Sequence, residues 1–315
     1  MGCCDGENCQ MKNGLIIGKQ TLIDCFGIKK NWLYLLFIII TSSLLAKVIF
    51  SNLAGSTSFT DQFYGSVSGL FLIGFFWIVG IPYFIYLGAI SVGAVSREFN
   101  EGTAMLIFAR PVRRLEFIIG KALGIITYGI LLNVISILFI ASVIGIMFGL
   151  DYATLLALYN TSFALIIYSV FVTLLITSVG LFISLIVKKT IISMTLLFVF
   201  ILLVFVFPPV INYSLESKIG NYQETIPDFA FLLGSLSTGI LNSFNLDLDS
   251  TTKNSLSLVT NTYTESTYSV PIPYGLIDNP KTSDMHLIVP IILFIGIFLV
   301  LFYLGLYILK RKEIY

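Results

Sequence analysis

Charged side chains gather in one stretch of the chain, residues 96–121, which lies between two long apolar runs. Glu98 and Glu101 are expected at the start of a short helix, where acids favour the positive end of the helix dipole. Pro111 would end that helix, because the residue before a proline is kept out of the α region. A soluble partner could dock on such a rigid element. The residues alone leave open an ordinary loop, whose arginines, such as Arg113, only set the membrane topology.

The rest of the sequence offers little chemistry of its own. Ion-coupled transport and hydrolysis within the membrane both need ionisable groups at membrane depth. The apolar runs carry none except Lys47 and Lys121, each near one end of its run; their strongest polar group is Asn133, and the only histidine, His286, borders the last run. The segment Gly14–Gln20 has one residue too few between its glycines, and no Ser or Thr after its lysine, to be a nucleotide-binding loop. We therefore expect no enzymatic activity, and no metal or cofactor bound by this chain.

The composition of the whole chain indicates the environment in which its segments lie. The 315 residues are 57% hydrophobic and only 11% charged, whereas soluble domains carry about a quarter charged residues. Several apolar runs reach the roughly 20 residues that cross a bilayer. We therefore predict an all-α polytopic membrane protein with six spans, a kink at Pro82 in the second, and these boundaries: about 32–50, 67–95, 117–150, 162–187, 191–211 and 287–309.

Basic residues predict the orientation, because Lys and Arg concentrate on the cytoplasmic side. With the N-terminus inside, fourteen of the eighteen Lys and Arg fall in inner segments, and the short outer loops 51–65 and 151–161 contain none. We therefore expect both termini in the cytoplasm and the protein in the plasma membrane.

Two regions lie outside the predicted spans. In residues 1–31, apolar residues such as Leu15, Ile16 and Ile23 recur at helical spacing, which is typical of an amphipathic helix on the inner membrane surface; an extension of the first span is the alternative. Residues 212–285 form a long, polar external loop. Its apolar piece, residues 229–241, is too short to span, and is expected in the outer interface or against the top of the bundle.

The charged stretch resembles the signature of type-2 ABC transporter permeases. In that family an acidic-Gly-Thr group, an (A/S)-x-P-x-(S/R)-R group and a Phe-x-x-Gly-Lys group follow the second span. The corresponding residues here are Arg97-Glu98, Glu101-Gly102-Thr103, Ala109-Arg110-Pro111-Val112-Arg113-Arg114, Phe117 and Gly120-Lys121. The six-span layout, the amphipathic N-terminal helix and the basic C-terminal tail also resemble the nitrous-oxide-maturation and sodium-efflux permeases.

The resemblance implies that residues 96–116 form a coupling segment that contacts a separate cytoplasmic ABC ATPase, which would bind ATP and magnesium. It also implies an exporter that works as a dimer with a second or homologous permease. The residues it assigns to coupling are Glu98, Glu101, Gly102, Thr103, Arg110, Pro111 and Arg113. Gly102 and Pro111 would serve equally well as a simple helix start and stop.

Two functions remain open at this stage. One is a transport permease that alternates between inward-facing and outward-facing states, driven by the ATPase. The other is a non-transporting membrane scaffold or assembly factor that acts through the loop 212–285. A secondary transporter is nearly excluded, because the spans lack ionisable groups.

Overall fold

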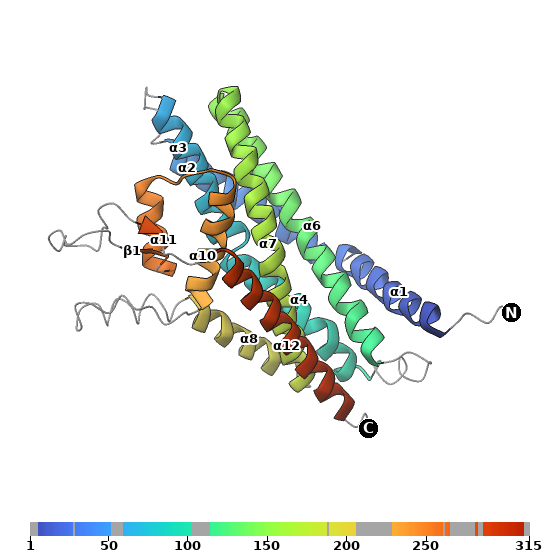
Figure 1. The fold of residues 1–315 in the computed structure, drawn as a ribbon. Coiled ribbons are helices and arrows are strands. Elements are labelled where there is room, and N and C mark those ends of the chain that lie inside the picture. The colour runs from blue at the N-terminus through green and yellow to red at the C-terminus, as the bar shows by residue number, and fades with distance from the viewer. Residues whose placement is uncertain are drawn as a thin grey trace.

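The computed structural model describes residues 6–27, 29–51, 59–102, 114–187, 189–205, 229–260, 262–264, 281–282 and 286–311. These residues are helical apart from short links and one antiparallel pair of two-residue strands, β1 (Tyr263–Thr264) and β2 (Lys281–Thr282). The helical elements are α1 (Gly6–Gly27), α2 (Lys29–Ser51), α3 (Phe59–Leu72), the π-helical turn η1 (Ile73–Ile78), α4 (Ile81–Asn100), α6 (Arg114–Phe148), α7 (Tyr152–Ile186), α8 (Thr190–Phe205), α10 (Phe229–Ser243), α11 (Ser250–Thr260) and α12 (Ile288–Arg311). Figure 1 shows them as an elongated bundle. The all-α class is confirmed.

Five helical stretches in the described part of the chain are long and apolar enough to cross a membrane: Asn31–Ile49, Phe63–Asn100, Arg114–Phe148, Tyr152–Ile186 and Ile288–Ile308. The predicted fifth span, 191–211, corresponds to α8, which has 16 residues and is followed by residues outside the described part. The fifth span, and with it the total of six, therefore stays a prediction.

The second span is interrupted rather than kinked at its proline. Helix α3 passes into η1, the chain turns at Val79 and Gly80, and α4 begins with Pro82 in its first turn. Proline is tolerated there because the first N–H groups of a helix have no partner within the helix. The turn needs Gly80, since a Cβ at that position would collide with the carbonyl oxygen of Phe76.

Helices α6 and α7 form a long hairpin at the centre of the molecule. Each has 35 residues, about 52 Å at 1.5 Å per residue, which exceeds the bilayer core of about 30 Å. Helix α7 begins at Tyr152, ten residues before the predicted membrane span 162–187. Its first turns bury Thr154 and Leu158. The boundaries of the span within this helix stay a prediction, because hydropathy marks where a helix enters lipid, not where it begins.

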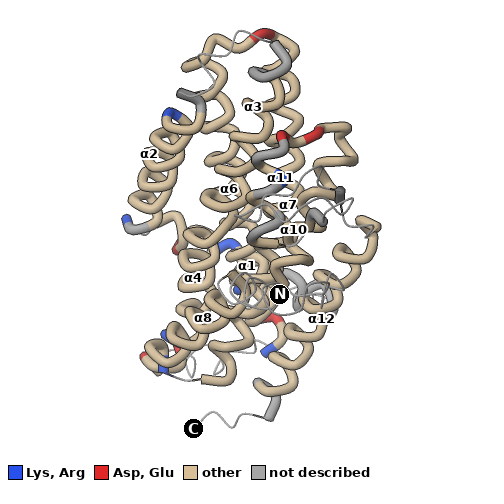
Figure 2. Tube along the Cα trace, turned by 90° about the vertical axis from the view of Figure 1, so that its left-hand side faces the viewer, with Lys and Arg blue, Asp and Glu red and all other residues tan. Residues whose placement is uncertain are grey.

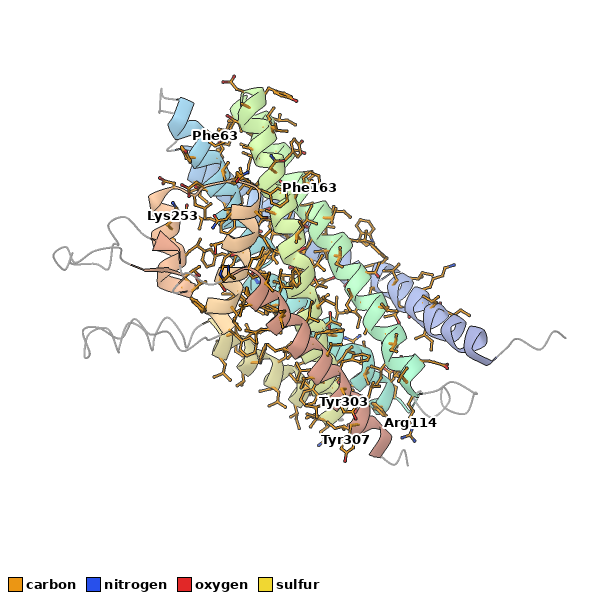
Figure 3. All side chains as sticks on the ribbon, in the orientation of Figure 1. Phe63, Arg114, Phe163, Lys253, Tyr303 and Tyr307 are labelled. Carbon is orange, nitrogen blue, oxygen red and sulfur yellow. The ribbon has the colours of Figure 1, made fainter. Side chains whose placement is uncertain are left out.

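One end of the bundle collects the ends of several helices. Helix α4 ends there at Asn100, α6 begins at Arg114, α7 ends at Ile186 and α8 begins at Thr190; we call this the Asn100 end. Figure 3 places Arg114 at this end, together with Tyr303 and Tyr307 of α12. Figure 2 shows long uncharged stretches along the helices, with charges gathered near their ends.

The apolar piece of the region between the last two predicted spans packs within the protein. Helix α10 is buried over most of its length, and Gly239 lies against Leu287 at the start of α12. The ring of Phe229 contacts that of Phe200 in α8. At the other end, the backbone N–H of Asp249 donates to Ser68 in α3 at 2.8 Å. Of the two predicted positions, packing against the bundle is the one observed (Figure 1).

Candidate functional site

An ion pair joins the end of α4 to the start of α6. The Nζ atom of Lys121 lies 2.6 Å from Oε1 of Glu98, and the two side chains are only 13% and 20% exposed. Partial burial limits the solvent screening that weakens exposed ion pairs. The pair joins the helices on either side of residues 103–113, which lie outside the described residues, so the flanks of the predicted coupling segment are held together.

A second link joins the end of α4 to the start of α8. The side-chain amide of Asn100 donates to Oγ1 of Thr190 at 2.8 Å, and the hydroxyl of Ser96 donates to the same oxygen at 3.3 Å. Residues about ninety positions apart in the chain therefore meet at the Asn100 end. The sequence did not single out Asn100 or Thr190, because no local pattern predicts a hydrogen bond between the ends of two helices that are distant in the chain.

The predicted short helix does not begin at Glu98 and Glu101, so this expectation was wrong. Glu98 lies in the last turn of α4, and Glu101 is the residue that caps its end. Gly102 follows with a φ of 71°, the left-handed conformation that glycine adopts after a helix end. Gly102 is therefore a helix stop, and the exposed Glu101 stands where α4 releases the chain.

The remaining residues assigned to coupling lie outside the described residues: Thr103, Arg110, Pro111 and Arg113. Glu116, at the end of the segment, is described and is buried at 7% exposure. Its Oε2 atom has no hydrogen-bond partner among the described residues. Sequence reasoning did not select Glu116, since its burial arises from the packing of α1 against the start of α6.

Helix α1 packs on the first turns of α6 through glycines on both helices. A Cβ at Gly120 would lie 2.6 Å from the carbonyl oxygen of Gly14, and a Cβ at Gly124 would lie 2.6 Å from that of Gly18. The helices run in the same direction, side by side (Figure 1). This is a small-xxx-small contact on each helix, which lets backbones approach closely. The segment Gly14–Gln20, rejected above as a nucleotide-binding loop, is thus part of a helix interface.

The other face of α1 is exposed among the described residues and mixes apolar side chains with the polar Lys19, Gln20 and Asp24. Leu15, Ile16 and Ile23 are 60%, 59% and 51% exposed, as expected for a helix that meets lipid on that side. At its end, the side-chain amide of Asn31 donates to the carbonyl of Cys25, and the indole N–H of Trp32 donates to that of Phe26 at 3.1 Å. These two bonds satisfy carbonyls that a helix end leaves open.

Comparison with known families identifies the framework that carries this site. The model of the family described as ABC-2 family transporter protein matches residues 28–314. The chain belongs to the ABC-2 transporter family. A comparison with curated protein sequences finds no match.

Membership in the ABC-2 family supports a transport permease subunit in the membrane, and the apolar helices support a multi-pass topology. Subunits of this family are typically non-catalytic and generally work with a cytoplasmic ABC ATPase. Among the described residues, no group of three or more His, Cys, Asp or Glu side chains could hold a metal ion.

The ABC-2 match begins at residue 28, immediately after α1 (Gly6–Gly27). The helix that packs against Gly120 and Gly124 therefore precedes the matched region. The sequence does contain a signal for the contact, namely two pairs of glycines four residues apart, Gly14 with Gly18 and Gly120 with Gly124. Only Gly120 was predicted to allow close packing, and its partner helix was not identified.

Proposed function

We propose that this chain is the transmembrane subunit of an ATP-driven exporter and that a separate cytoplasmic ABC ATPase docks on residues 96–116. The match to the ABC-2 family over residues 28–314 carries the proposal. Hydrolysis on the ATPase, with its ATP and magnesium, would drive the bundle between inward-facing and outward-facing states. The direction, export, follows from the resemblance to export permeases.

The links at the Asn100 end suit this role. A partner bound to residues 96–116 would pull directly on α4 and α6, which the Glu98–Lys121 pair joins. The Asn100–Thr190 bond would pass the displacement to α8, and the glycine contact would carry α1 with α6. Glu101, Thr103, Arg110 and Arg113 would contact the ATPase, and Gly102 and Pro111 would fix the path of the chain between them.

In this proposal the Asn100 end faces the cytoplasm, together with both termini, and α8 forms part of the fifth of six spans. Exposed cations at this end, among them Arg97 and Lys189, agree with the enrichment of basic residues on the cytoplasmic side. The plasma membrane is the proposed location. A second permease would complete the transporter, because membrane assemblies of this kind close most simply with two-fold symmetry.

The first test is to identify what the protein binds in its own membrane. We would purify the tagged chain in mild detergent and analyse the complex by mass spectrometry. Recovery of an ATPase with a nucleotide-binding loop, near one copy per permease, is the expected result. A chain recovered alone, or only with external partners, would contradict the proposal and favour the scaffold that acts through residues 212–285.

The second test targets the docking residues. Glu101→Ala and Arg113→Ala, singly and together, are expected to reduce ATPase recovery and transport, with the double variant most affected. Asp151→Ala is the matched control, since Asp151 is an exposed acid at the opposite end of the α6–α7 hairpin. Full recovery of ATPase and transport in the double variant would show that these residues do not couple.

A further inference from the structure

The guanidinium of Arg97 lies over a glycine one turn earlier in the same helix. The three atoms nearest to a Cβ at Gly93 would all belong to this side chain, with Nε at 3.4 Å and Cζ at 3.6 Å. Gly93 is buried, whereas Arg97 is exposed. Long side chains in a helix point toward its N-terminus, and here that direction leads from the end of α4 toward the middle of the membrane-crossing stretch Phe63–Asn100.

This position leaves the charge of Arg97 unmatched within the described part of the chain. Neither of the two ion pairs among the described residues includes Arg97. Its neighbour Glu98 is paired with Lys121. Glu101 follows four residues later, at a spacing that can give an ion pair on a helix, but the guanidinium is turned the other way, toward Gly93. An anion that balances Arg97 is therefore expected from outside the protein.

The end of the bundle that carries Arg97 also carries side chains that mark a membrane surface. Tyr303 and Tyr307 of α12 are 70% and 45% exposed and lie at the Asn100 end (Figure 3). Exposed tyrosines are typical of the level of the lipid head groups. The side chain of Asn100 ties the start of α8 to α4, and Ile191 there is 81% exposed. Arg97 thus lies at the end of the bundle where apolar surface and interfacial side chains meet.

At the level of the head groups, a phosphate is the anion that fits a guanidinium. The guanidinium presents its N–H donors in one plane and can bind two phosphate oxygens at once. We propose that Arg97 binds the phosphate of a phospholipid head group in the leaflet at the Asn100 end, with Gly93 leaving room for the guanidinium. A lipid with a net negative charge is preferred, because the ammonium group of a zwitterionic lipid offsets the charge of its phosphate.

This assignment separates Arg97 from the residues proposed to contact the ATPase. Glu101 caps the end of α4, whereas the guanidinium of Arg97 lies one turn back, beside Gly93. The lipid site depends on the membrane location of the chain and on these contacts, and not on coupling to an ATPase. It can therefore be tested on the full chain alone.

Native mass spectrometry of the purified chain, without an ATPase, measures the binding of single lipids. The chain in detergent would be titrated with dioleoyl phosphatidylglycerol, which is anionic, and separately with dioleoyl phosphatidylcholine, which is zwitterionic. We expect the wild type to bind the anionic lipid more tightly at its first site. Arg97→Gln should weaken that binding by about tenfold, as for loss of hydrogen bonds to a charged group, and should change phosphatidylcholine binding much less.

Three further variants separate a specific head-group site from a general effect of charge. Lys47→Gln also removes one exposed positive charge, near the C-terminal end of α2, and as the matched control it should keep the wild-type affinity. Arg97→Lys keeps the charge without the planar donors and should recover only part of the affinity. Gly93→Leu keeps the arginine but fills the space beside it, so it should weaken binding of the anionic lipid. The midpoint of thermal unfolding without added lipid shows whether each variant is folded.

The proposal is overturned if Arg97→Gln leaves the binding of phosphatidylglycerol unchanged. It is also overturned if Lys47→Gln weakens that binding equally, because net charge alone would then explain it. Ammonium phosphate, replacing ammonium acetate at equal ionic strength, tests for a free anion in place of a lipid. If inorganic phosphate displaces phosphatidylglycerol from the wild type but not from Arg97→Gln, the site binds a free anion and the lipid assignment is wrong. None of these outcomes depends on whether residues 96–116 couple to an ATPase.

Discussion

Helix α6 and helix α4 both carry glycines at helix contacts, but what lies opposite those glycines differs. On α6, a Cβ at Gly120 or Gly124 would meet carbonyl oxygens of α1. On α4, the atoms nearest to a Cβ at Gly88 would be those of the Leu197 side chain. A backbone cannot yield to an added methyl group, whereas a leucine side chain can change its rotamer.

The difference suggests that the α1–α6 pair is rigid and that α4 can move. The α1–α6 pair has a single way to pack, so the two helices should behave as one rigid element. On the side of α8, helix α4 meets the side chain of Leu197, and a hydrogen bond between the Tyr83 and Thr173 side chains ties it to α7. An element that must move during a transport cycle is better held by contacts that can rearrange. Substitutions at Gly124 and Gly88 test this difference directly, and changes at the Glu98–Lys121 pair and at Cys25 test it indirectly.

The largest effect is expected when a large side chain separates the rigid pair. Gly124→Leu would push its side chain against Gly18 and Thr21 of α1, and such overpacking costs about 1–3 kcal/mol or more. We expect a lower midpoint of thermal unfolding and faster proteolysis of α1. Gly296→Leu is the control, since no atom lies within 4 Å of a Cβ there. Equal stability of the two variants would refute the rigid contact.

A methyl group alone should distinguish the two regions. Gly124→Ala and Gly88→Ala gain the same helix propensity, about 1 kcal/mol. In Gly88→Ala the side chain of Leu197 must move, and we expect a midpoint of thermal unfolding near that of the wild type. For Gly124→Ala we expect a clearly lower midpoint. If both variants lose stability equally, it does not matter whether a glycine faces backbone or side-chain atoms, and the proposed difference between the α1–α6 pair and α4 is wrong.

The ion pair between Glu98 and Lys121 links the two regions. Lys121→Gln leaves a partly buried carboxylate without its cation, and we expect a loss of about 1 kcal/mol at neutral pH, measured by chemical denaturation in detergent. The exchanged pair, Glu98→Lys with Lys121→Glu, should recover part of that loss. No recovery in the exchanged pair would mean that the two residues matter separately rather than as a pair.

The smallest effect concerns a probe for separation of α1 from α6. Cys25 lies on the packed face of α1 at 5% exposure, and burial raises the pKa of its thiol from 9.0 to about 11, against the opposing charge of Lys121. Only the thiolate reacts with maleimides. With Cys3, Cys4 and Cys9 replaced by serine, labelling at pH 8 should be slow and should accelerate up to about pH 11.

The control for that probe is Cys25→Ser with Ile23→Cys, which places the thiol on the exposed face of the same helix. It should label quickly at pH 8. Adding Gly124→Leu to the Cys25 protein should abolish the protection. Rapid labelling of Cys25 in the otherwise unaltered helix would show that α1 leaves α6 frequently, and that the pair is not rigid.

Much of the fold could be predicted from the sequence, because transfer of apolar side chains into lipid is a local property of each segment. The apolar pattern of the sequence located the first three predicted spans and the last one. The fourth predicted span, 162–187, covers only part of α7, which buries Thr154 and Leu158 before that span. The sequence also predicted a kink at Pro82, although the chain turns just before that residue, at Gly80.

For the candidate site, the sequence gathered Glu98, Glu101 and Gly102 into one segment but placed the acids at a helix start. They lie at a helix end, because α4 continues to Asn100 before Gly102 stops it. The partner of Glu98 is Lys121, beyond the loop, and no pattern within the segment predicts that pair. The resemblance that reached from residue 97 to residue 121 did include both residues, without relating them.

The sequence by itself determined that the protein is a helical membrane protein of the ABC-2 family, because hydropathy and a short motif are both written in consecutive residues. The tertiary structure decided which helices are joined and how. The contact of Gly18 with Gly124 and the bond of Tyr83 with Thr173 both depend on the distance between two backbones. That distance is set by the packing of every neighbouring helix at once, so no single segment of the chain encodes it.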